Sequence, residues 1–483
     1  SKFIKFKKTI KNMYNSLIIS LWFLILCSCG SPKKQKLEEK SPPNIIFILS
    51  DDQAWGDYGF MGHPYIKTPN IDQLASESAT YSRGYVTSPL CGPSLASIIT
   101  GKYAFEHKQT GNDAGNSGRD ASLWIENGYK KVKKRKSNNY LYSKERNDKF
   151  DIIKANFYQN KLLTDYLGVK GYKSFQSGKW WLGSWEEGKF DGGMTHGDYK
   201  RKGRHGDEGL KIGREGLEPI FNFIEKTNEN GSPFFVWYAP FLPHTPHNPP
   251  QELLDKYINL APNESIAKYW AMCEWLDKTV GEMMNYLKEK SLDKNTLIVY
   301  TTDNGWIQSD KRNRYAPRSK RAPHEGGIRT PIMFKLPGVI KPKMDKSSLV
   351  SNIDLVPTVL DILNISFDSL PGISIMKKEK IENRETIFVE CYNHDILNVE
   401  KPTETILYKV ALNKKWKLMV PNQDLVIRDF TDPQENYYGF YSNQIQLFDL
   451  EQDPNEKVNL ALKYPEIVVK MNQQIDEWWQ PNN

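Results

Sequence analysis

The sequence predicts an α/β protein in which helices cover both faces of a largely parallel sheet, followed by a smaller antiparallel sheet. Two observations carry this prediction. First, unbroken apolar runs are typical of strands buried on both faces of a sheet, and they occupy residues 44–49, 234–239 and 296–301. Second, helical patterns at 71–82 and 266–289 lie between these runs, and such alternation indicates a layered α/β sheet.

After about residue 375 the pattern changes to short strand-like segments separated by turns, which predicts a small antiparallel sheet. The strand-like segments are 387–389, 408–412, 416–420 and 446–450. A last helix is predicted over 466–479, and an amphipathic helix over 351–363 precedes the change. The predicted organisation is therefore a main domain over 43–370 and a C-terminal α+β subdomain over 371–483.

The N-terminus has the pattern of an export signal. Residues 1–28 hold five lysines and no acidic residue, followed by an apolar run that is too short for a comfortable membrane span. The sequence Leu-Cys-Ser before Cys29 resembles a bacterial lipobox, which predicts a lipid on Cys29 and a flexible tether over 29–42. A plain cleaved signal peptide is the alternative. Either way we expect an exported protein, in the periplasm or at the outer membrane, with no membrane contact beyond a lipid anchor.

Composition excludes several other classes of protein. Of the net charge of +8, the signal region carries five units, so the remainder is only mildly basic at +3, which argues against nucleic acid as a partner. Beyond the signal region only Cys91, Cys273 and Cys391 remain. Three scattered cysteines make neither a disulfide framework nor a zinc site.

Hard oxygen donors follow two of the predicted strands. Asp51 and Asp52 come directly after the first strand, and Asp303 and Asn304 follow the strand at 296–301. Ligands of open α/β sheets bind beyond the carboxyl ends of the strands. Such side chains are often only solvated, but two sets at two strand ends predict a metal site. Carboxylate and amide oxygens favour Ca²⁺, and Mg²⁺ less so.

Residues 88–102 hold Cys91, a proline two positions later, and a helix-like run that ends at Thr100-Gly101. Taken alone, Cys91 is interpreted as a small buried side chain. The whole stretch, however, resembles the signature of type I sulfatases, and similar motifs continue to residue 457. The resemblance implies an alkaline-phosphatase-like fold and calcium-dependent hydrolysis of sulfate esters. It also implies that a maturation enzyme oxidises Cys91 to formylglycine, whose hydrate would join the metal ligands.

Further segments resemble family motifs that hold the substrate. One supplies Lys179, and another places Lys320 five residues before Glu325-Gly-Gly. The segment 243–247 supplies His244, which would act as general acid at the leaving oxygen, and His247 as a further substrate-binding residue. The alternative is that these lysines and histidines are merely solvated. Catalytic roles are therefore predicted for Cys91, Lys179, His244 and Lys320.

Two positions depart from the family pattern. Leu95 stands where the family usually has arginine, and Trp181 where it usually has the histidine that regenerates the aldehyde. One interpretation is a variant sulfatase with a substitute base, for which the candidates are His196, His205 and His247. The other is a degenerate lipoprotein that binds sulfated glycans without turnover. A third hypothesis is a phosphodiester or phosphonate hydrolase of the same fold.

The expected substrate is a sulfated polysaccharide or oligosaccharide. Basic clusters near the predicted site could contact a polyanion, although such runs are often only solvated; they span 130–136, 200–204 and 311–321. Tryptophans near the same loops were candidates for stacking on sugar rings: Trp180, Trp181, Trp185 and Trp306.

Overall fold

The computed structural model describes residues 41–115, 144–197, 205–311, 313–367, 369–396, 398–423 and 442–481. The predicted signal peptide, Cys29 and most of the tether lie outside the described residues. The basic clusters at 130–136 and 200–204 lie outside them as well. Along the described part of the chain, no helix has both the length and the apolar character needed to cross a membrane.

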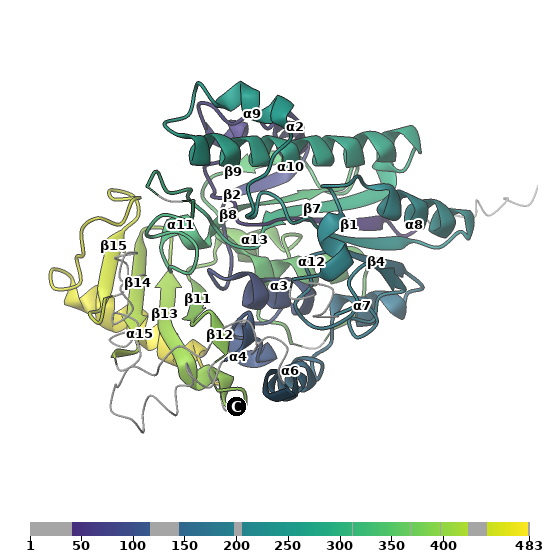
Figure 1. Cartoon of the computed structure of the whole chain (residues 1–483). Coiled ribbons are helices and arrows are strands. Elements are labelled where there is room, and N and C mark those ends of the chain that lie inside the picture. Colours follow the sequence, from purple (N-terminus) through teal and green to yellow (C-terminus); the bar gives the residue numbers. More distant parts are fainter. Residues whose placement is uncertain are drawn as a thin grey trace, which may run out of the picture. The chain divides into compact units, whose positions relative to one another are not determined.

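A nine-stranded mixed sheet forms the centre of the fold (Figure 1). Its strands are β1 (Asn44–Ser50), β2 (Ala79–Tyr85), β4 (Lys173–Gly178), β5 (Gly192–Gly193), β6 (Phe234–Ala239), β7 (Thr296–Thr302), β8 (Arg329–Lys335), β9 (Lys343–Asp345) and β10 (Val350–Ser351). The spatial order is β10-β2-β8-β7-β1-β6-β4-β5, with β9 beside β2. The central strands are parallel, while β8 runs antiparallel to both of its neighbours.

The unbroken apolar run at 44–49 forms β1, which is buried on both of its faces. Ile45, Phe47 and Leu49 enter one apolar layer, and Ile46 and Ile48 enter the layer on the opposite face. Because successive side chains of a strand point to opposite faces, a strand covered on both sides needs apolar residues at every position. The predicted α/β fold with helices on both faces is thereby confirmed.

The covering helices lie on the two faces of the sheet (Figure 1). One face is covered by α2 (Pro69–Ser76), α8 (Glu218–Glu229) and α10 (Glu264–Glu289). The other is covered by α3 (Cys91–Thr100), α7 (Leu163–Gly168) and α12 (Leu355–Ile362). Further helices of the described chain are α4 (Ala104–His107), α6 (Lys144–Phe157), α9 (Gln251–Tyr257), α11 (Glu325–Ile328) and α13 (Lys378–Glu382).

Two predicted helices have different bounds in the structure. The helix predicted over 71–82 is α2, which ends at Ser76, and the chain then enters β2 at Ala79. In β2 the apolar residues alternate with Thr80 and Ser82, which is the period of a strand. The helix predicted over 351–363 begins later, because Ser351 closes β10 and a short 3₁₀ turn precedes α12.

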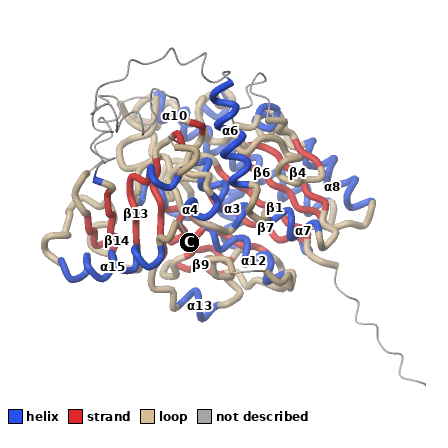
Figure 2. Tube along the Cα trace, turned by 90° about the horizontal axis from the view of Figure 1, so that it is seen from below, coloured by secondary structure: helices blue, strands red, loops and turns tan. Residues whose placement is uncertain are grey.

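The C-terminal antiparallel sheet is confirmed. It has the order β11-β13-β14-β15, formed by β11 (Ile387–Tyr392), β13 (Ile406–Leu412), β14 (Trp416–Pro421) and β15 (Gln446–Asp449). Helix α15 (Pro465–Trp478) packs on one face, and the other face meets β2 and α11. Figure 2 shows β13 and β14 grouped apart from β1, β6 and β7. A two-stranded pair joins β3 (Asp113–Ala114) to β12 (Asp395–Ile396). The domain boundary at residue 370 stays a prediction.

Candidate functional site

The carboxyl ends of β1 and β7 bring the four predicted oxygen donors together. The two strands pair in parallel register, with Ser50 opposite Thr302, so the residues that follow them are neighbours. The backbone N–H of Asp52 donates to Asp303 Oδ1 at 3.1 Å, and Asn304 Nδ2 donates to Asp52 Oδ1 at 2.7 Å. Asp52 adopts a positive φ of 61° to make this turn.

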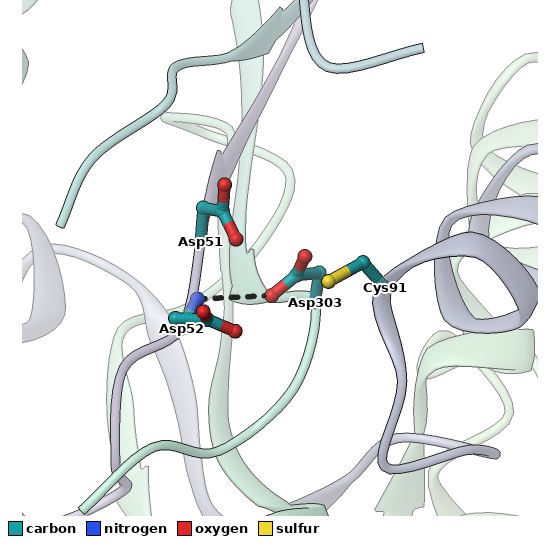
Figure 3. Close-up of side chains that lie close together, drawn as sticks. All are labelled: Asp51, Asp52, Cys91 and Asp303. Atoms are coloured by element: carbon teal, nitrogen blue, oxygen red, sulfur yellow. Dashed lines mark hydrogen bonds between the residues drawn. The ribbon is translucent and has the colours of Figure 1, made fainter. Parts of the chain in front are cut away.

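Helix α3 carries Cys91 to the same place. Cys91 is the first residue of α3, and its side chain points toward Asp303 (Figure 3). Ligand atoms of Asp51, Asp52, Cys91 and Asp303 all lie within 4.8 Å of one another. Burial of the thiol is the main cause that raises the pKa of Cys91 to about 12. The unmodified side chain is therefore a neutral thiol in this setting.

Both predicted lysines contact the carboxylate cluster. Lys179 Nζ lies 2.7 Å from Asp51 Oδ1 and 3.5 Å from Asp303 Oδ2. Lys320 Nζ lies 2.6 and 2.7 Å from the two carboxylate oxygens of Asp52. Burial alone would lower the pKa of each lysine, but attraction to the aspartates raises both above the usual value. Both lysines are therefore charged.

Gly178 explains how Lys179 reaches the cluster from the end of β4. The backbone N–H of Lys179 donates to the carbonyl of Ala239 at 2.7 Å. A Cβ on Gly178 would lie only 1.8 Å from that carbonyl oxygen, and Gly178 has a φ of +80°. Only glycine tolerates both conditions, so the Gly-Lys pair is required by the geometry of this strand end.

The donor set fits a hard divalent cation. Three carboxylates and one amide supply oxygen ligands, which Ca²⁺ and Mg²⁺ prefer. Asp51 Oδ2 and Asn304 Oδ1 are buried and have no hydrogen-bond partner among the described residues. Buried oxygens are normally satisfied, so these two atoms are suited to a bound ion. Burial is the largest cause that raises the pKa of Asp51 well above its ordinary value, and a cation would offset that cost.

Of the two predicted histidines, His244 is the one that contacts the carboxylate cluster. His244 Nδ1 donates to the carbonyl of Thr245 at 2.6 Å, and its Nε2 lies 3.3 Å from Asp52 Oδ2. Burial, with repulsion from Lys179 and Lys320, lowers the pKa of His244 well below its usual value.

His247 lies farther along the same loop, beside the rings of Tyr269 and Trp306 at 5.4 and 5.9 Å. Neither of its ring nitrogens has a hydrogen-bond partner among the described residues. Burial lowers the pKa of His247 to about 4. A neutral imidazole with two unsatisfied nitrogens remains available to a bound molecule.

The two departures from the family pattern are both buried apolar side chains. Leu95 and Trp181 are buried in the same apolar cluster as Cys91. The Trp181 ring lies 5.8 Å from Lys179 Nζ and 4.3 Å from the ring of His205. The His205 ring is also 6.1 Å from that of His244. His196, the other sequence candidate near this region, is exposed.

Sequence reasoning missed some site neighbours and misjudged others. Trp180, Trp181 and Trp306 were expected to stack on sugar rings, but all three are buried in the apolar core, and Trp185 packs partly buried against it. The missed residues include Asn112, whose Oδ1 accepts from the backbone N–H of Gly92 at 2.7 Å. Asn112 therefore caps the helix that carries Cys91. No local pattern marks such a residue, because its partner lies 20 positions away.

Comparisons with known proteins identify the family. The sulfatase family profile matches residues 43–365, and the profile described as N-sulphoglucosamine sulphohydrolase, C-terminal, matches residues 315–480. The chain is 25% identical to a sulfatase of Formosa agariphila, over 96% of this chain and 94% of the relative. It is 23% identical to the N-acetylgalactosamine-6-sulfatase of Mus musculus, over 95% of this chain and 89% of the relative.

The fold is also found in solved structures. The crystal structure of Ps i-CgsB in complex with k-i-k-neocarrahexaose covers 92% of this chain and 94% of its own, with a TM-score of 0.68 and 24% identity. At that identity the likeness shows the fold. The family match confirms the prediction of a sulfuric ester hydrolase. The profile match over two thirds of the sequence, together with relatives aligned along nearly its whole length, shows that the chain belongs to the sulfatase family.

Proposed function

We propose that this protein is exported and hydrolyses sulfate esters on a sulfated polysaccharide or oligosaccharide. The observation that carries the proposal is the buried cluster of Asp51, Asp52 and Asp303 with Lys179 and Lys320, facing residue 91. The carbohydrate names of the relatives support the substrate class. The lysine-rich N-terminus supports export, and the residues before Cys29 support a lipid anchor.

The charge of this cluster suits an ester that carries one negative charge. Three aspartates and two lysines give a net charge of −1, which a divalent cation would change to +1. A sulfate monoester is a monoanion, so the complex would be neutral. A phosphate monoester carries up to two charges and would leave an excess of negative charge in a buried site, which is costly. The charge count supports a sulfate ester, and equally the monoanionic phosphodiesters and phosphonate esters.

Residues Asp51, Asp52, Asp303 and Asn304 would hold the cation, which we propose to be Ca²⁺. When bound, it would neutralise sulfate oxygens and lower the pKa of a coordinated hydroxyl. Oxidised to formylglycine, residue 91 would supply that hydroxyl as a hydrated aldehyde. The position of Cys91 at the first turn of α3 also directs the positive end of the helix dipole toward the anion.

The protein's own side chains bind and orient the ester. Lys179 and Lys320 are charged and would contact the sulfate oxygens from two sides. To act as general acid, His244 would have to carry a proton on both ring nitrogens: Nδ1–H donates to the Thr245 carbonyl, and Nε2–H, favoured by the negative charge of a bound ester, transfers its proton to the leaving oxygen. His247 would bind a neighbouring substrate hydroxyl, because both of its buried nitrogens lack partners among the described residues.

Of the three candidates for a substitute base, His205 has the best support. Its ring packs against Trp181, which stands at the position of the family histidine, and it faces His244. His247 instead packs beside Trp306. We therefore propose that His205 accepts the proton that the family histidine accepts elsewhere.

A mass measurement on one peptide tests the central proposal. The protein would be produced in a host with a sulfatase-maturation enzyme, and the mass of the tryptic peptide from Gly84 to Lys102 would be determined by mass spectrometry. The aldehyde or its hydrate at position 91, with release of inorganic sulfate from a sulfated oligosaccharide, is the expected result. Cys91→Ala is the matched control and should release none. Release by Cys91→Ala equal to that by the wild type would overturn the mechanism.

The second candidate function is a sulfated-glycan binder without turnover. Leu95 and Trp181 favour it, because both stand where the family pattern has residues tied to formylglycine chemistry. An intact thiol at position 91, with saturable and salt-sensitive binding of the glycan, would establish the binder. Hydrolysis of a phosphodiester or phosphonate ester faster than the matching sulfate ester would instead favour the third hypothesis.

A further inference from the structure

Lys320 lies on an irregular segment, residues 316–324, between β7 and α11. Two residues of this segment, Arg318 and Arg321, have φ values of +60° and +69°. Residues other than glycine rarely adopt this conformation, and it persists only where the surroundings enforce it. The position of the Lys320 ammonium beside Asp52 therefore depends on what holds the segment.

The C-terminal sheet supplies much of that support. The thiol of Cys391, on β11, donates to the carbonyl of Arg321 at 3.3 Å. Nη1 of Arg318 donates to the carbonyl of Glu456, just after β15, at 2.7 Å. On the other side, the backbone N–H of Arg321 donates to Pro89, two residues before Cys91, at 2.8 Å. The segment is thus held between the C-terminal sheet and the start of α3.

The two glycines of the Glu325-Gly-Gly motif let α11 approach the same segment. A Cβ on Gly326 would lie 2.5 Å from the Arg318 carbonyl oxygen, and one on Gly327 would lie 2.1 Å from that of Ala322. Neither position has room for a side chain. The orientation of α11 therefore fixes the backbone on both sides of Lys320.

A buried ionic network fixes α11 to the C-terminal sheet. Lys417 Nζ, on β14, lies 3.1 Å from Glu325 Oε1 and 2.6 Å from Glu456 Oε1. The backbone N–H of Glu325 donates to Glu456 Oε2 at 2.8 Å, and the Tyr85 hydroxyl donates to Glu325 Oε2 at 3.1 Å. Lys417 has 0% exposure and pairs with both carboxylates, and Glu325 Oε2 has a longer ion pair, 3.7 Å, with Arg329 Nη1.

We propose that Lys417 is a positioning residue for the sulfatase reaction: it joins Glu325 to Glu456 and so holds the segment that presents Lys320 to the ester. The inference rests on the proposed function of Lys320. It gives a role in the site to the C-terminal sheet, whose described residues contribute no side chain to the carboxylate cluster. It also gives a role to Glu456, which follows β15 and is not among the proposed catalytic residues.

The test combines amide hydrogen exchange with a mutant cycle. The variants are Lys417→Met and, because that change leaves two buried carboxylates without their lysine, Lys417→Met/Glu456→Gln, which removes one of those charges. We expect exchange in residues 316–324 to accelerate at least tenfold. We expect kcat/KM for a sulfate ester to fall by about ten- to a hundredfold, since small misplacements of catalytic groups have effects of that size.

The cycle separates positioning from general destabilisation. In a Lys320→Met background, the Lys417 change should alter the residual kcat/KM by less than twofold, because the residue that it positions is already absent. If the loss of kcat/KM in the double variant equals the product of the losses in the two single variants, the proposal is overturned. Leu418→Ala is the matched control: Leu418 is the next residue on β14 but belongs to the cluster that faces α15. In Leu418→Ala, the exchange rates of residues 316–324 and kcat/KM should both stay within twofold of the wild-type values. All variants are measured at a temperature at which they are folded.

Failure of the two proposals can be told apart. If the wild-type protein hydrolyses no sulfate ester, the proposed function fails, and the exchange measurement decides the role of Lys417 alone. Unchanged exchange in residues 316–324 of both Lys417 variants would overturn the positioning role, whatever the activity.

Discussion

Asp303→Asn would isolate the charge that the site offers to a cation. Asp303 Oδ1 accepts the backbone N–H groups of Asp52 and Asn304, at 3.1 and 2.6 Å. Asparagine keeps this oxygen, so the loop retains both hydrogen bonds. The change replaces Oδ2 by an NH₂ group, which cannot bind a cation, and takes the charge of the cluster from −1 to zero. We therefore expect a folded protein that has lost its affinity for calcium.

The size of the effect follows from linkage. Calcium at 100 times its Kd stabilises a protein by about 2.7 kcal/mol. If the substitution raises Kd about a hundredfold, as the loss of support for a metal ligand can, the same calcium concentration contributes only about 0.4 kcal/mol. The loss is thus about 2 kcal/mol. Since 1 kcal/mol shifts Tm by roughly 2–4 °C in domains of about 200 residues, the calcium-dependent shift should shrink by several degrees.

Thermal unfolding of chelator-treated protein, with and without added CaCl₂, measures this shift directly. Asp277→Asn is the matched control, because Asp277, on α10, is a buried aspartate whose carboxylate accepts the backbone N–H of Ile71, on α2. It should lower Tm but keep the full calcium shift. A full calcium shift in Asp303→Asn would refute the ligand assignment. A shift produced by MgCl₂ but not by CaCl₂ would refute the choice of calcium.

Two further predictions concern single side chains. Lys179→Met should lower kcat/KM by about 10²–10³-fold in a sulfate-release assay, because it removes a buried electrostatic contact to the reacting group. Lys189→Met, at an exposed lysine, is the control. A change below threefold in Lys179→Met would contradict the proposed role of Lys179. Burial raises the pKa of Glu390 to about 7, above its ordinary value of 4.5, so the folded state loses stability as pH rises through this range. The free energy of unfolding of Glu390→Gln, relative to that of the wild type, should therefore rise by ~3 kcal/mol between pH 4.5 and 8, measured by urea unfolding. A difference between the two proteins that does not change with pH would contradict this prediction.

The sequence was sufficient to predict the site residues that lie at the ends of neighbouring strands. The runs at 44–49 and 296–301 are apolar at every position, so they had to be buried, and parallel neighbours bring their ends together. That reasoning predicted the meeting of Asp51 and Asp303. It could not predict the pairing of Lys179 with Asp51 and of Lys320 with Asp52, because Lys179 follows β4, which is not adjacent to β1, and Lys320 lies on a segment without regular structure.

Tertiary packing accounts for the errors and omissions. Trp181 and Trp306 look like surface aromatic residues in polar loops, yet both are buried because the loops fold over the core. Lys417 lies in a strand pattern that alternates as expected, and a lysine there predicts an exposed face. It is instead buried, because Glu325 and Glu456 from two distant segments converge on it. Only the assembled fold reveals such a residue.

The departures at Leu95 and Trp181 act together in the structure. Both lie in the apolar cluster of Cys91, and each stands where the family pattern has a side chain that carries or can carry positive charge. An arginine at position 95 would bring the cluster of three aspartates and two lysines to neutrality, whereas this chain stays at −1. We therefore expect that in this protein a bound divalent cation, more than the side chains, supplies the positive charge that an ester anion requires.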